Sequence, residues 1–139
     1  MMDERERHAR GLLVRRAVLG DAHVDRARAA RTELTAEFDD LITRYAWGEI
    51  WNRPGLSRST RSLVTIAMLI AQSRPAELRL HLRASAACGV TREELRELLL
   101  QAAVYCGVPA ANSAFHLAEA ELSPGGPDAG NETRNGGDK

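Results

Sequence analysis

Apolar residues recur at intervals of three and four positions along most of the chain, and no run of alternating polar and β-branched residues is present. This spacing is typical of amphipathic helices, which bury one face and expose the other. Glycine and proline residues fall between the periodic segments and mark their ends. The pattern predicts an all-α protein, a compact bundle of about six helices.

The end signals of the first half predict two clear helices. The first helix ends at Gly20, and residues 21–31 continue as a loop or a short helix. Thr35 is placed to cap the next helix. Apolar residues then follow at helical spacing: Phe38, Leu41, Ile42 and Tyr45. Gly48 and the later Pro54 are expected to end this helix.

A central helix is predicted to begin at Ser57 or Ser59. From Leu63 to Ala71 it is apolar on nearly every side. A helix of this kind has to be surrounded by other helices.

Three further helices are predicted after the central one. Pro75 suits the first turn of a helix that ends near Gly89, because proline is tolerated there and glycine favours C-terminal ends. Thr91 and Glu94 form a capping-box pattern for the next helix. The sequence then breaks at residues 107–109, and a last helix runs to about residue 122.

Length and composition indicate one domain. The chain has 139 residues, of which 44% are hydrophobic, which is enough for one core. We assign residues 1–10 to a polar N-terminal segment, residues 11–122 to the helical domain and residues 123–139 to a tail. The tail is rich in glycine and has no apolar residue larger than alanine apart from proline, so it is expected to be disordered.

Charge and hydropathy argue against nucleic-acid and membrane partners. The formal net charge is zero, which does not favour binding to a polyanion. The charged N-terminus is not followed by a long apolar region, and the stretch SLVTIAMLIAQS is too short to span a bilayer. We therefore expect a soluble, cytoplasmic protein.

One candidate site is the pair Glu77 and His81, which lie four residues apart and therefore on one helix face. An ordinary exposed ion pair has the same spacing. A second candidate lies at the break after Cys106, where the N–H groups of a new helix could hold an anion and Asn112 and His116 follow at the same four-residue spacing. A tight helix corner with a capping asparagine is the alternative there.

A third candidate is the aromatic segment TRYAWGEIWNR, which brings together Tyr45, Trp47, Glu49 and Trp51. It fits the lip of a pocket, and it equally fits a structural tryptophan cluster.

The two cysteines favour neither a zinc site nor a redox pair. Cys88 and Cys106 are separated by seventeen residues, which matches neither spacing. Cys88 is expected to be a small buried residue.

The sequence resembles the γ-carboxymuconolactone decarboxylases over roughly residues 11–122. The most specific stretches are RRAVLGDAHV, YAWGE and YCGVPAANSAFH. This family belongs to the alkylhydroperoxidase D-like superfamily, whose redox members carry the motif C-x-x-C-x-x-x-H on a helix. His81 matches the motif's histidine, whereas Arg74 and Glu77 occupy the cysteine positions and Ser62 the position of an upstream glutamate. Dithiol chemistry needs two adjacent thiols, so this frame does not support it.

The resemblance implies cofactor-free decarboxylation of 4-carboxymuconolactone, with no metal. His81 would deliver a proton, because histidine titrates near neutral pH, and Glu77 would orient it. Arg61 and Arg44, with Arg58 behind them, would pair with the substrate carboxylates. The other candidates for substrate binding are Arg74, Tyr45, Trp47, Glu49, Trp51, Cys106, Asn112 and His116.

Two alternatives stay open at this point. One is a redox or peroxide-related enzyme of the same fold, and the other is a non-catalytic helical oligomer that acts as a binding module. The resemblance and the apolar central helix both favour a homo-oligomer, with a trimer or hexamer ahead of a dimer.

Overall fold

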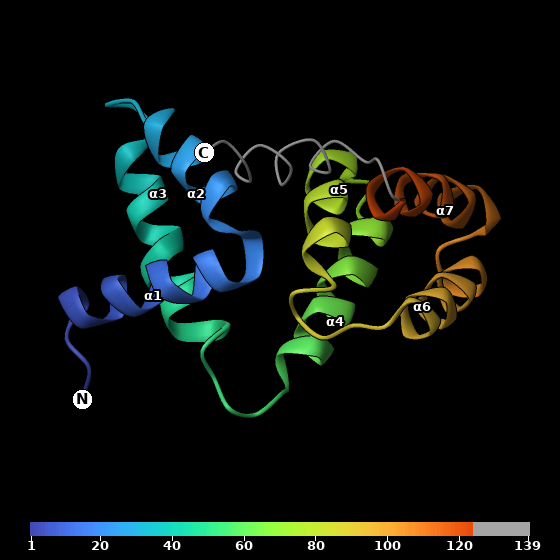
Figure 1. Ribbon diagram of the computed structural model, residues 1–139, viewed down its shortest axis with the longest axis horizontal. Coiled ribbons are helices and arrows are strands. Elements are labelled where there is room, and N and C mark those ends of the chain that lie inside the picture. Colours follow the sequence, from blue (N-terminus) through green and yellow to red (C-terminus); the bar gives the residue numbers. More distant parts are fainter. Residues whose placement is uncertain (124–139) are drawn as a thin grey trace, which may run out of the picture. The chain divides into compact units, whose positions relative to one another are not determined.

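The computed structural model describes residues 1–123, and all regular secondary structure in this part is helical (Figure 1). The elements are α1 (Glu4–Leu19), α2 (Asp21–Ala29), α3 (Ala36–Ile42), the π-helix η1 (Thr43–Ile50), α4 (Arg58–Ala71), α5 (Pro75–Ala84), α6 (Arg92–Tyr105) and α7 (Val108–Leu122). The all-α prediction is confirmed. The described part holds more than the expected six helices, because residues 21–29 form a helix of their own and a π-helix continues α3.

The chain divides into two compact units. Unit 1 comprises residues 1–64 and 84–91, and unit 2 comprises residues 65–83 and those from 92 onward. Helix α1 begins at Glu4, so most of the polar segment 1–10 is helical. The expected disorder of the tail concerns residues that, from 124 on, lie outside the described part.

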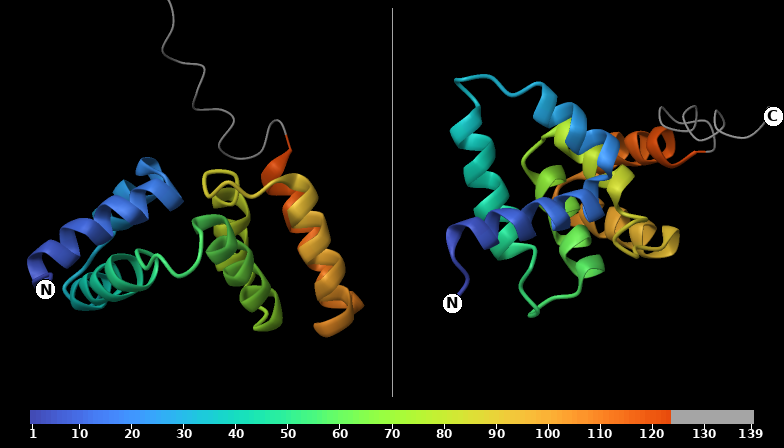
Figure 2. Two further views of the ribbon diagram at one scale, coloured as in Figure 1. Left: turned by 90° about the horizontal axis from the view of Figure 1, so that it is seen from below. Right: turned by 60° about the vertical axis from the view of Figure 1, so that its left-hand side comes forward.

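Unit 1 is built where α1 crosses η1 (Figure 2). Two glycines permit this crossing. A Cβ atom on Gly11 would clash with the backbone carbonyl of Thr43, and one on Gly48 would clash with the backbone carbonyl of Arg7. The two backbones therefore touch directly, with no side chain between them at these points.

Replacing Gly11 by alanine is expected to destabilise unit 1, although alanine normally favours a helix by about 0.5 to 1 kcal/mol. The added methyl group would meet rigid backbone, and overpacking of this kind costs about 1 to 3 kcal/mol or more. Urea unfolding should show the loss as a lower midpoint. Gly55→Ala is the matched control, because nothing lies within 4 Å of the position of its added Cβ. An unchanged midpoint for Gly11→Ala would contradict the close crossing.

Ion pairs join α1 to the segment around α3. Arg15 donates a hydrogen bond to Asp39 at 2.9 Å, and their side chains are only 10% and 13% exposed. Arg31 donates to both Asp39 and Asp40, at 3.3 and 3.2 Å. His8 lies 3.2 Å from the same Asp40 carboxylate. This network fixes the middle of α3 against α1.

A small apolar core lies beneath the crossing. Its buried members are Val14, Val18, Trp47, Ala84 and Cys88. Trp51 stacks on Trp47, with ring centroids 5.1 Å apart. The expectation that Cys88 is a small buried residue is confirmed.

Three details of unit 1 differ from the sequence-based expectations. Gly48 does not end the helix, because η1 continues to Ile50 and Gly48 is needed at the crossing. Thr35 occupies the cap position of α3, but its hydroxyl accepts a hydrogen bond from the Thr32 N–H, which precedes the helix. Ser57 does cap α4 as predicted, since its hydroxyl accepts a hydrogen bond from the Thr60 N–H at 3.2 Å.

Helix α4 is less enclosed than its composition predicts. Val64 is 40% exposed and Met68 is 57% exposed, whereas Ile66 and Ile70 are buried. One side of this apolar helix is therefore open in the described chain.

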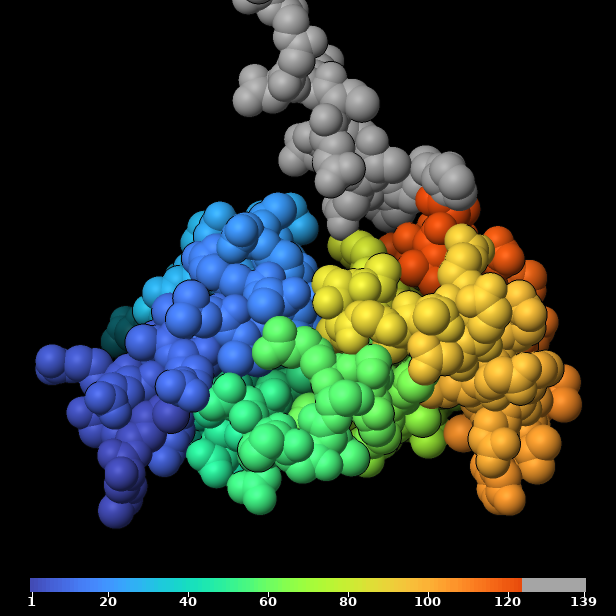
Figure 3. Space-filling view, turned by 60° about the horizontal axis from the view of Figure 1, so that its bottom comes forward, coloured from blue at the N-terminus to red at the C-terminus, as the bar shows by residue number. Residues whose placement is uncertain are grey.

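In unit 2, α6 packs against α7, and their atoms lie against each other in the space-filling view (Figure 3). Buried residues of the two helices form the contact: Leu95, Leu99, Ala102, Ala111, Ala114 and Ala118. The corner between the helices is made at Gly107, whose φ of 96° suits glycine. Arg83 of α5 pairs with Glu121 of α7 at 3.0 Å.

The helix ends of unit 2 are predicted well with one exception. Helix α5 begins at Pro75, and α6 begins directly after Thr91. Helix α5 ends at Ala84, five residues before the expected Gly89, and turns fill the interval. Gly89 has a φ of 85°, so it serves this turn and does not end the helix.

Candidate active site

Helix α5 carries His81, the candidate proton donor. His81 is half-buried and its Nδ1 atom is shielded from solvent. The neighbouring Leu78 and Leu82 are buried, at 4% and 0% exposure, so this helix is held by its apolar face. The imidazole is thereby placed on a rigid element and partly withdrawn from water.

Glu77 lies one turn before His81 and is exposed. The two residues lie four positions apart and therefore on one face of α5.

Arg74 precedes α5 at the rim of an apolar groove of about 290 Å³. The groove is lined by the end of α4, the start of α5 and the first half of α7: Leu69, Ile70, Ser73, Arg74, Pro75, Leu78, Ala110, Ser113, Ala114 and Leu117. Arg74 is exposed, so its guanidinium is available to an anion from solvent.

The corner between α6 and α7 places Cys106 half-buried beside Gly107. Gly107 is the cap residue of α7, so Asn112 lies inside the helix and does not cap it. Asn112 and His116 are both exposed on α7. The capping role considered for Asn112 is therefore wrong.

Unit 1 holds the arginines proposed for carboxylate binding. Arg58 and Arg61 lie on the first turns of α4, three residues apart and therefore on one face. Arg61 donates from Nη2 to the Arg53 carbonyl at 3.1 Å, and its Nε atom is shielded from solvent. Arg44 lies elsewhere in the unit, where its Nε pairs with Glu4 at 3.2 Å.

The aromatic segment is divided between two environments. Trp47 is buried at 6% exposure, and Trp51 stacks on it, which matches the structural-cluster interpretation. Tyr45 is 62% exposed. Glu49 lies between Arg7 and Arg53, at 3.7 and 3.6 Å from their guanidinium nitrogens.

The thiol of Cys88 is poorly suited to redox chemistry. Burial raises its pKa, and the Ser62 hydroxyl and the Arg58 charge offset this only in part. The thiol therefore stays protonated at neutral pH, and a protonated thiol is a weak nucleophile. Both cysteines are free.

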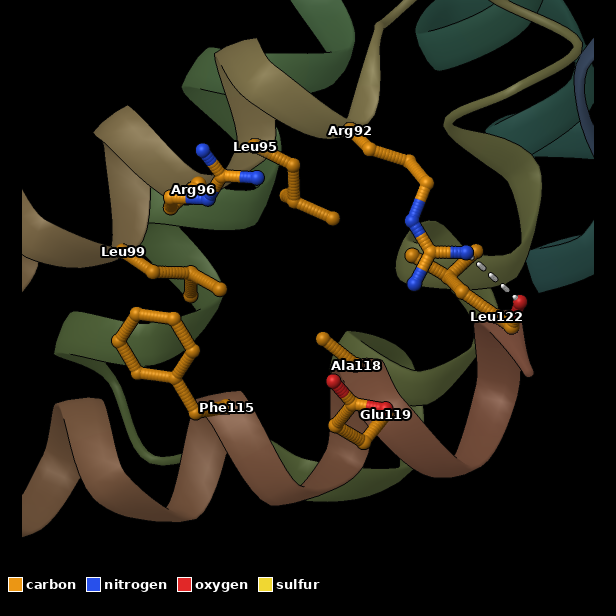
Figure 4. A pocket seen from close by; sticks show the side chains of 8 residues that line it. All are labelled: Arg92, Leu95, Arg96, Leu99, Phe115, Ala118, Glu119 and Leu122. Carbon is orange, nitrogen blue, oxygen red and sulfur yellow. Dashed lines mark hydrogen bonds between the residues drawn. The ribbon is translucent and has the colours of Figure 1, made fainter.

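One groove was not anticipated from the sequence. Helices α6 and α7 run along its two sides, and residues at positions i, i+3, i+4 and i+7 of each helix line it (Figure 4). The lining residues are Arg92, Leu95, Arg96, Leu99, Phe115, Ala118, Glu119 and Leu122. Arg92 donates a hydrogen bond to the Leu122 carbonyl at 3.3 Å, so it helps to close the end of α7.

Residues 1–123 contain no group of three or more histidine, cysteine, aspartate or glutamate side chains that could hold a metal ion. No helix in this range has the length and apolar character needed to cross a membrane.

The fold and these side chains define a helical protein with a half-buried histidine and exposed arginines. Arg74 and Glu77 stand where the C-x-x-C-x-x-x-H motif has its two cysteines. Residues 36–120 match the model of the carboxymuconolactone decarboxylase family. The chain belongs to this family, and the resemblance seen in its motifs is confirmed.

Three curated relatives support this placement. The 4-carboxymuconolactone decarboxylase of Acinetobacter baylyi is 51% identical over 118 residues, which cover 85% of this chain and 88% of the relative. The nitrosuccinic acid decarboxylase npaB of Metarhizium robertsii is 42% identical over 113 residues, covering 81% and 79%. A 4-carboxymuconolactone decarboxylase sequence from Pseudomonas putida is 52% identical over 48 residues, covering 34% of this chain and 100% of that sequence.

Proposed function

We propose that this protein is a carboxy-lyase that converts 4-carboxymuconolactone to β-ketoadipate enol-lactone and CO2. The observation that carries the proposal is the 51% identity to the 4-carboxymuconolactone decarboxylase of Acinetobacter baylyi, over most of both chains. The reaction belongs to the protocatechuate branch of aromatic catabolism, and we infer a cytoplasmic location from this role.

The substrate supplies its own electron sink. As CO2 leaves the γ-carbon of the lactone, the electron pair moves through the ring double bond to the lactone carbonyl and forms a dienolate. The protein has to hold two carboxylates, stabilise the developing oxyanion and deliver one proton to the carbon beside the carbonyl. We assign the binding of the carboxylates and the delivery of the proton to side chains of this protein below, and the proposed reaction uses no cofactor.

We assign the proton transfer to His81. A half-buried imidazole on a rigid helix is suited to a positioned proton donor, because it is fixed in place and partly shielded from water. Glu77, one turn away and exposed, would influence the histidine through its charge.

Arg61 and Arg58 are our first candidates for carboxylate binding. They share one face of α4, and a guanidinium pairs with a carboxylate through two parallel hydrogen bonds. Arg44 is a weaker candidate, because Glu4 already pairs with it. The other proposed contacts are Arg74, Tyr45, Trp47, Glu49, Trp51, Cys106, Asn112 and His116.

The name of the second relative, a nitrosuccinic acid decarboxylase, indicates a decarboxylation of the same chemical type. Nitrosuccinate and 4-carboxymuconolactone each carry two carboxylates, and in each the leaving carboxylate has an electron-accepting group to take up the electron pair. We infer that the shared requirement is a site for a dicarboxylate whose decarboxylation gives a delocalised anion.

The direct test is CO2 release from 4-carboxymuconolactone by the purified protein, coupled to detection of the enol-lactone. Nitrosuccinate serves as a second substrate in the same assay. We expect turnover of the lactone well above that of nitrosuccinate. A well-folded protein that releases no CO2 from the lactone would contradict the proposal.

Replacing Arg61 by lysine is expected to weaken substrate binding by about 1.5 to 3 kcal/mol, roughly a 10- to 150-fold loss of affinity. The reason is that the lysine ammonium is a point charge, whereas the planar arginine guanidinium forms two parallel hydrogen bonds with a carboxylate. Binding can be measured in the His81→Asn background, where slow turnover preserves the substrate. Arg26→Lys on α2 is the control, because that side chain is exposed and remote in sequence. Unchanged affinity in Arg61→Lys would assign Arg61 a structural role.

The two alternatives now have specific tests. A redox enzyme would require a reactive thiol; the raised pKa of Cys88 makes it unsuitable, so a low-pKa Cys106 would have to be found by thiol titration. A non-catalytic binding module would show no CO2 release in the assay above. We further propose a homo-oligomer, a trimer or hexamer ahead of a dimer, which light scattering can test.

A further inference from the structure

The helical segment formed by α3 and η1 carries apolar residues on two opposite faces. The inner face is buried through Thr43, Trp47 and Gly48. The opposite face carries four large side chains that are 90%, 64%, 52% and 62% exposed: Leu34, Phe38, Leu41 and Tyr45. We call these four residues the outer stripe. A helix with two apolar faces needs a partner on each.

The spacing of the outer stripe is that of a seam between paired helices. Its residues follow one another at intervals of four, three and four positions. In paired helices, apolar residues at alternating three- and four-residue intervals form the contact seam. Leu34 lies in the turn just before α3, and Tyr45 lies in η1, so the seam runs through both elements.

The surface beside the outer stripe is hollowed and charged. A shallow hollow is lined by Phe38 and Leu41 together with Glu37, Asp40 and Arg44. Glu37 and Arg44 are seven positions apart, which places them along the same edge of the seam, one acidic and one basic. A partner that binds this surface has to contribute apolar side chains, a basic side chain beside Glu37 and an acidic side chain beside Arg44.

We propose that the partner is a second copy of this chain, paired antiparallel along the outer stripe. In that register Leu34 of one copy opposes Tyr45 of the other, and Phe38 opposes Leu41. Both pairs are centred between residues 39 and 40, so one two-fold axis that passes near these residues generates both contacts. The arrangement is self-complementary, as a two-fold interface requires.

The charges select the antiparallel direction. In the same register, Glu37 of each copy faces residue 42 of the other and lies diagonally, two positions along the helix, from its Arg44, so the two-fold axis creates two diagonal ion pairs. A parallel pair in register would place the equivalent charges on opposite sides of the seam and would form neither ion pair. Arg44 also pairs with the largely exposed Glu4 of its own chain, which leaves the guanidinium at the edge of the seam.

This inference does not depend on the proposed reaction. A two-fold contact through α3 and η1 accounts for a dimer, or for the pairs within a hexamer. It does not by itself build a trimer, which would have to use another face.

A charge exchange tests the contact. Glu37→Arg and Arg44→Glu, made separately, should each reduce the molar mass measured by light scattering to about half. The variant that carries both changes should restore the original mass, because the two ion pairs are rebuilt with reversed sign. Residues 37 and 44 of one chain are seven positions apart, about 10 Å along an α-helix, and are not the three- or four-residue neighbours that pair on one helix, so restoration of the mass indicates contact between copies.

Matched controls and a second variant complete the test. Glu93→Arg on α6 and Arg26→Glu on α2 make the same charge changes at exposed positions away from the stripe and should leave the mass unchanged. Leu41→Glu should also halve the mass, while circular dichroism shows that the helices persist. A single-charge variant with unchanged mass, or a doubly changed variant that fails to regain it, would overturn the proposal. Either result would mean that another part of the same chain, or no second copy, covers the outer stripe.

Discussion

Replacing His81 by asparagine is expected to lower the turnover of 4-carboxymuconolactone by roughly 10²- to 10⁴-fold, the range for loss of a positioned acid or base. Asparagine keeps a polar side chain on α5 but has no titratable proton. The half-buried position allows it to be accommodated without a large cavity, so the fold and the assembly should survive. Initial rates of CO2 release, together with circular dichroism and light scattering, measure each part of this expectation.

Two neighbours on the same helix provide the comparison. Arg79→Gln removes an exposed charge two residues from the histidine and should leave turnover near that of the unchanged protein. Glu77→Gln should have an intermediate effect, because Glu77 is exposed and can act only through its charge or by orienting the ring. If His81→Asn retains turnover but unfolds more easily, the histidine is a packing residue and the proton comes from elsewhere.

The largest effect on stability is expected from Asp39→Asn. Asp39 accepts hydrogen bonds from Arg15 and Arg31, and the Arg15 side chain is only 10% exposed. Removing the carboxylate leaves the Arg15 charge almost buried without its counterion, a change that costs about 3 to 5 kcal/mol in comparable pairs. Urea unfolding at neutral pH should show this loss in the free energy of unfolding.

The same contacts predict how stability depends on pH. Burial alone would raise the pKa of Asp39, but the hydrogen bonds and charges of Arg15 and Arg31 outweigh it and lower the pKa. The unfolded chain therefore takes up this proton at a higher pH than the folded one. The contribution of ionised Asp39 to the free energy of unfolding is complete above the ordinary aspartate pKa near 4. It is lost as the pH falls through the lowered pKa of Asp39 in the folded protein.

A surface carboxylate gives the matched control. Asp21 pairs with Arg16 at 3.1 Å, but its side chain is 78% exposed, so Asp21→Asn should hardly change stability. The difference between Asp39→Asn and the unchanged protein should shrink in acid, because both then lack the negative charge. If the free energies of unfolding of Asp39→Asn and the unchanged protein differ by the same amount from neutral pH to pH 3, the charge of Asp39 does not contribute to stability.

The ends of most helices followed from local signals. Pro75, Ser57 and Gly107 act on the backbone at their own positions, so sequence alone is sufficient to place them. The histidine on α5 could also be found, because its motif lies within one helix. Such features depend on residues that are close together in the sequence.

The features that were missed depend on distant partners. Gly11 lies in the middle of a helix, and nothing near it in the sequence reveals that the carbonyl of Thr43 occupies the space of its missing side chain. Gly48 is typical of a helix end by its sequence context, because nothing near it in the sequence indicates the close contact with the carbonyl of Arg7. Tyr45 was grouped with Trp47 and Trp51 because they are neighbours in the sequence, yet helix geometry exposes the tyrosine while Trp47 is buried.

The crossing of α1 and η1 also restricts how this chain can change in length. Each glycine has to face one particular carbonyl, and inserting or deleting one residue within a helix rotates everything beyond it by about 100°. Such a change would turn a bulky side chain into the contact between the two backbones. Between α1 and η1, insertions and deletions are therefore expected in the connection around residues 30–33, and beyond η1 in the connection at residues 51–57, since neither changes the phase of the two crossing helices.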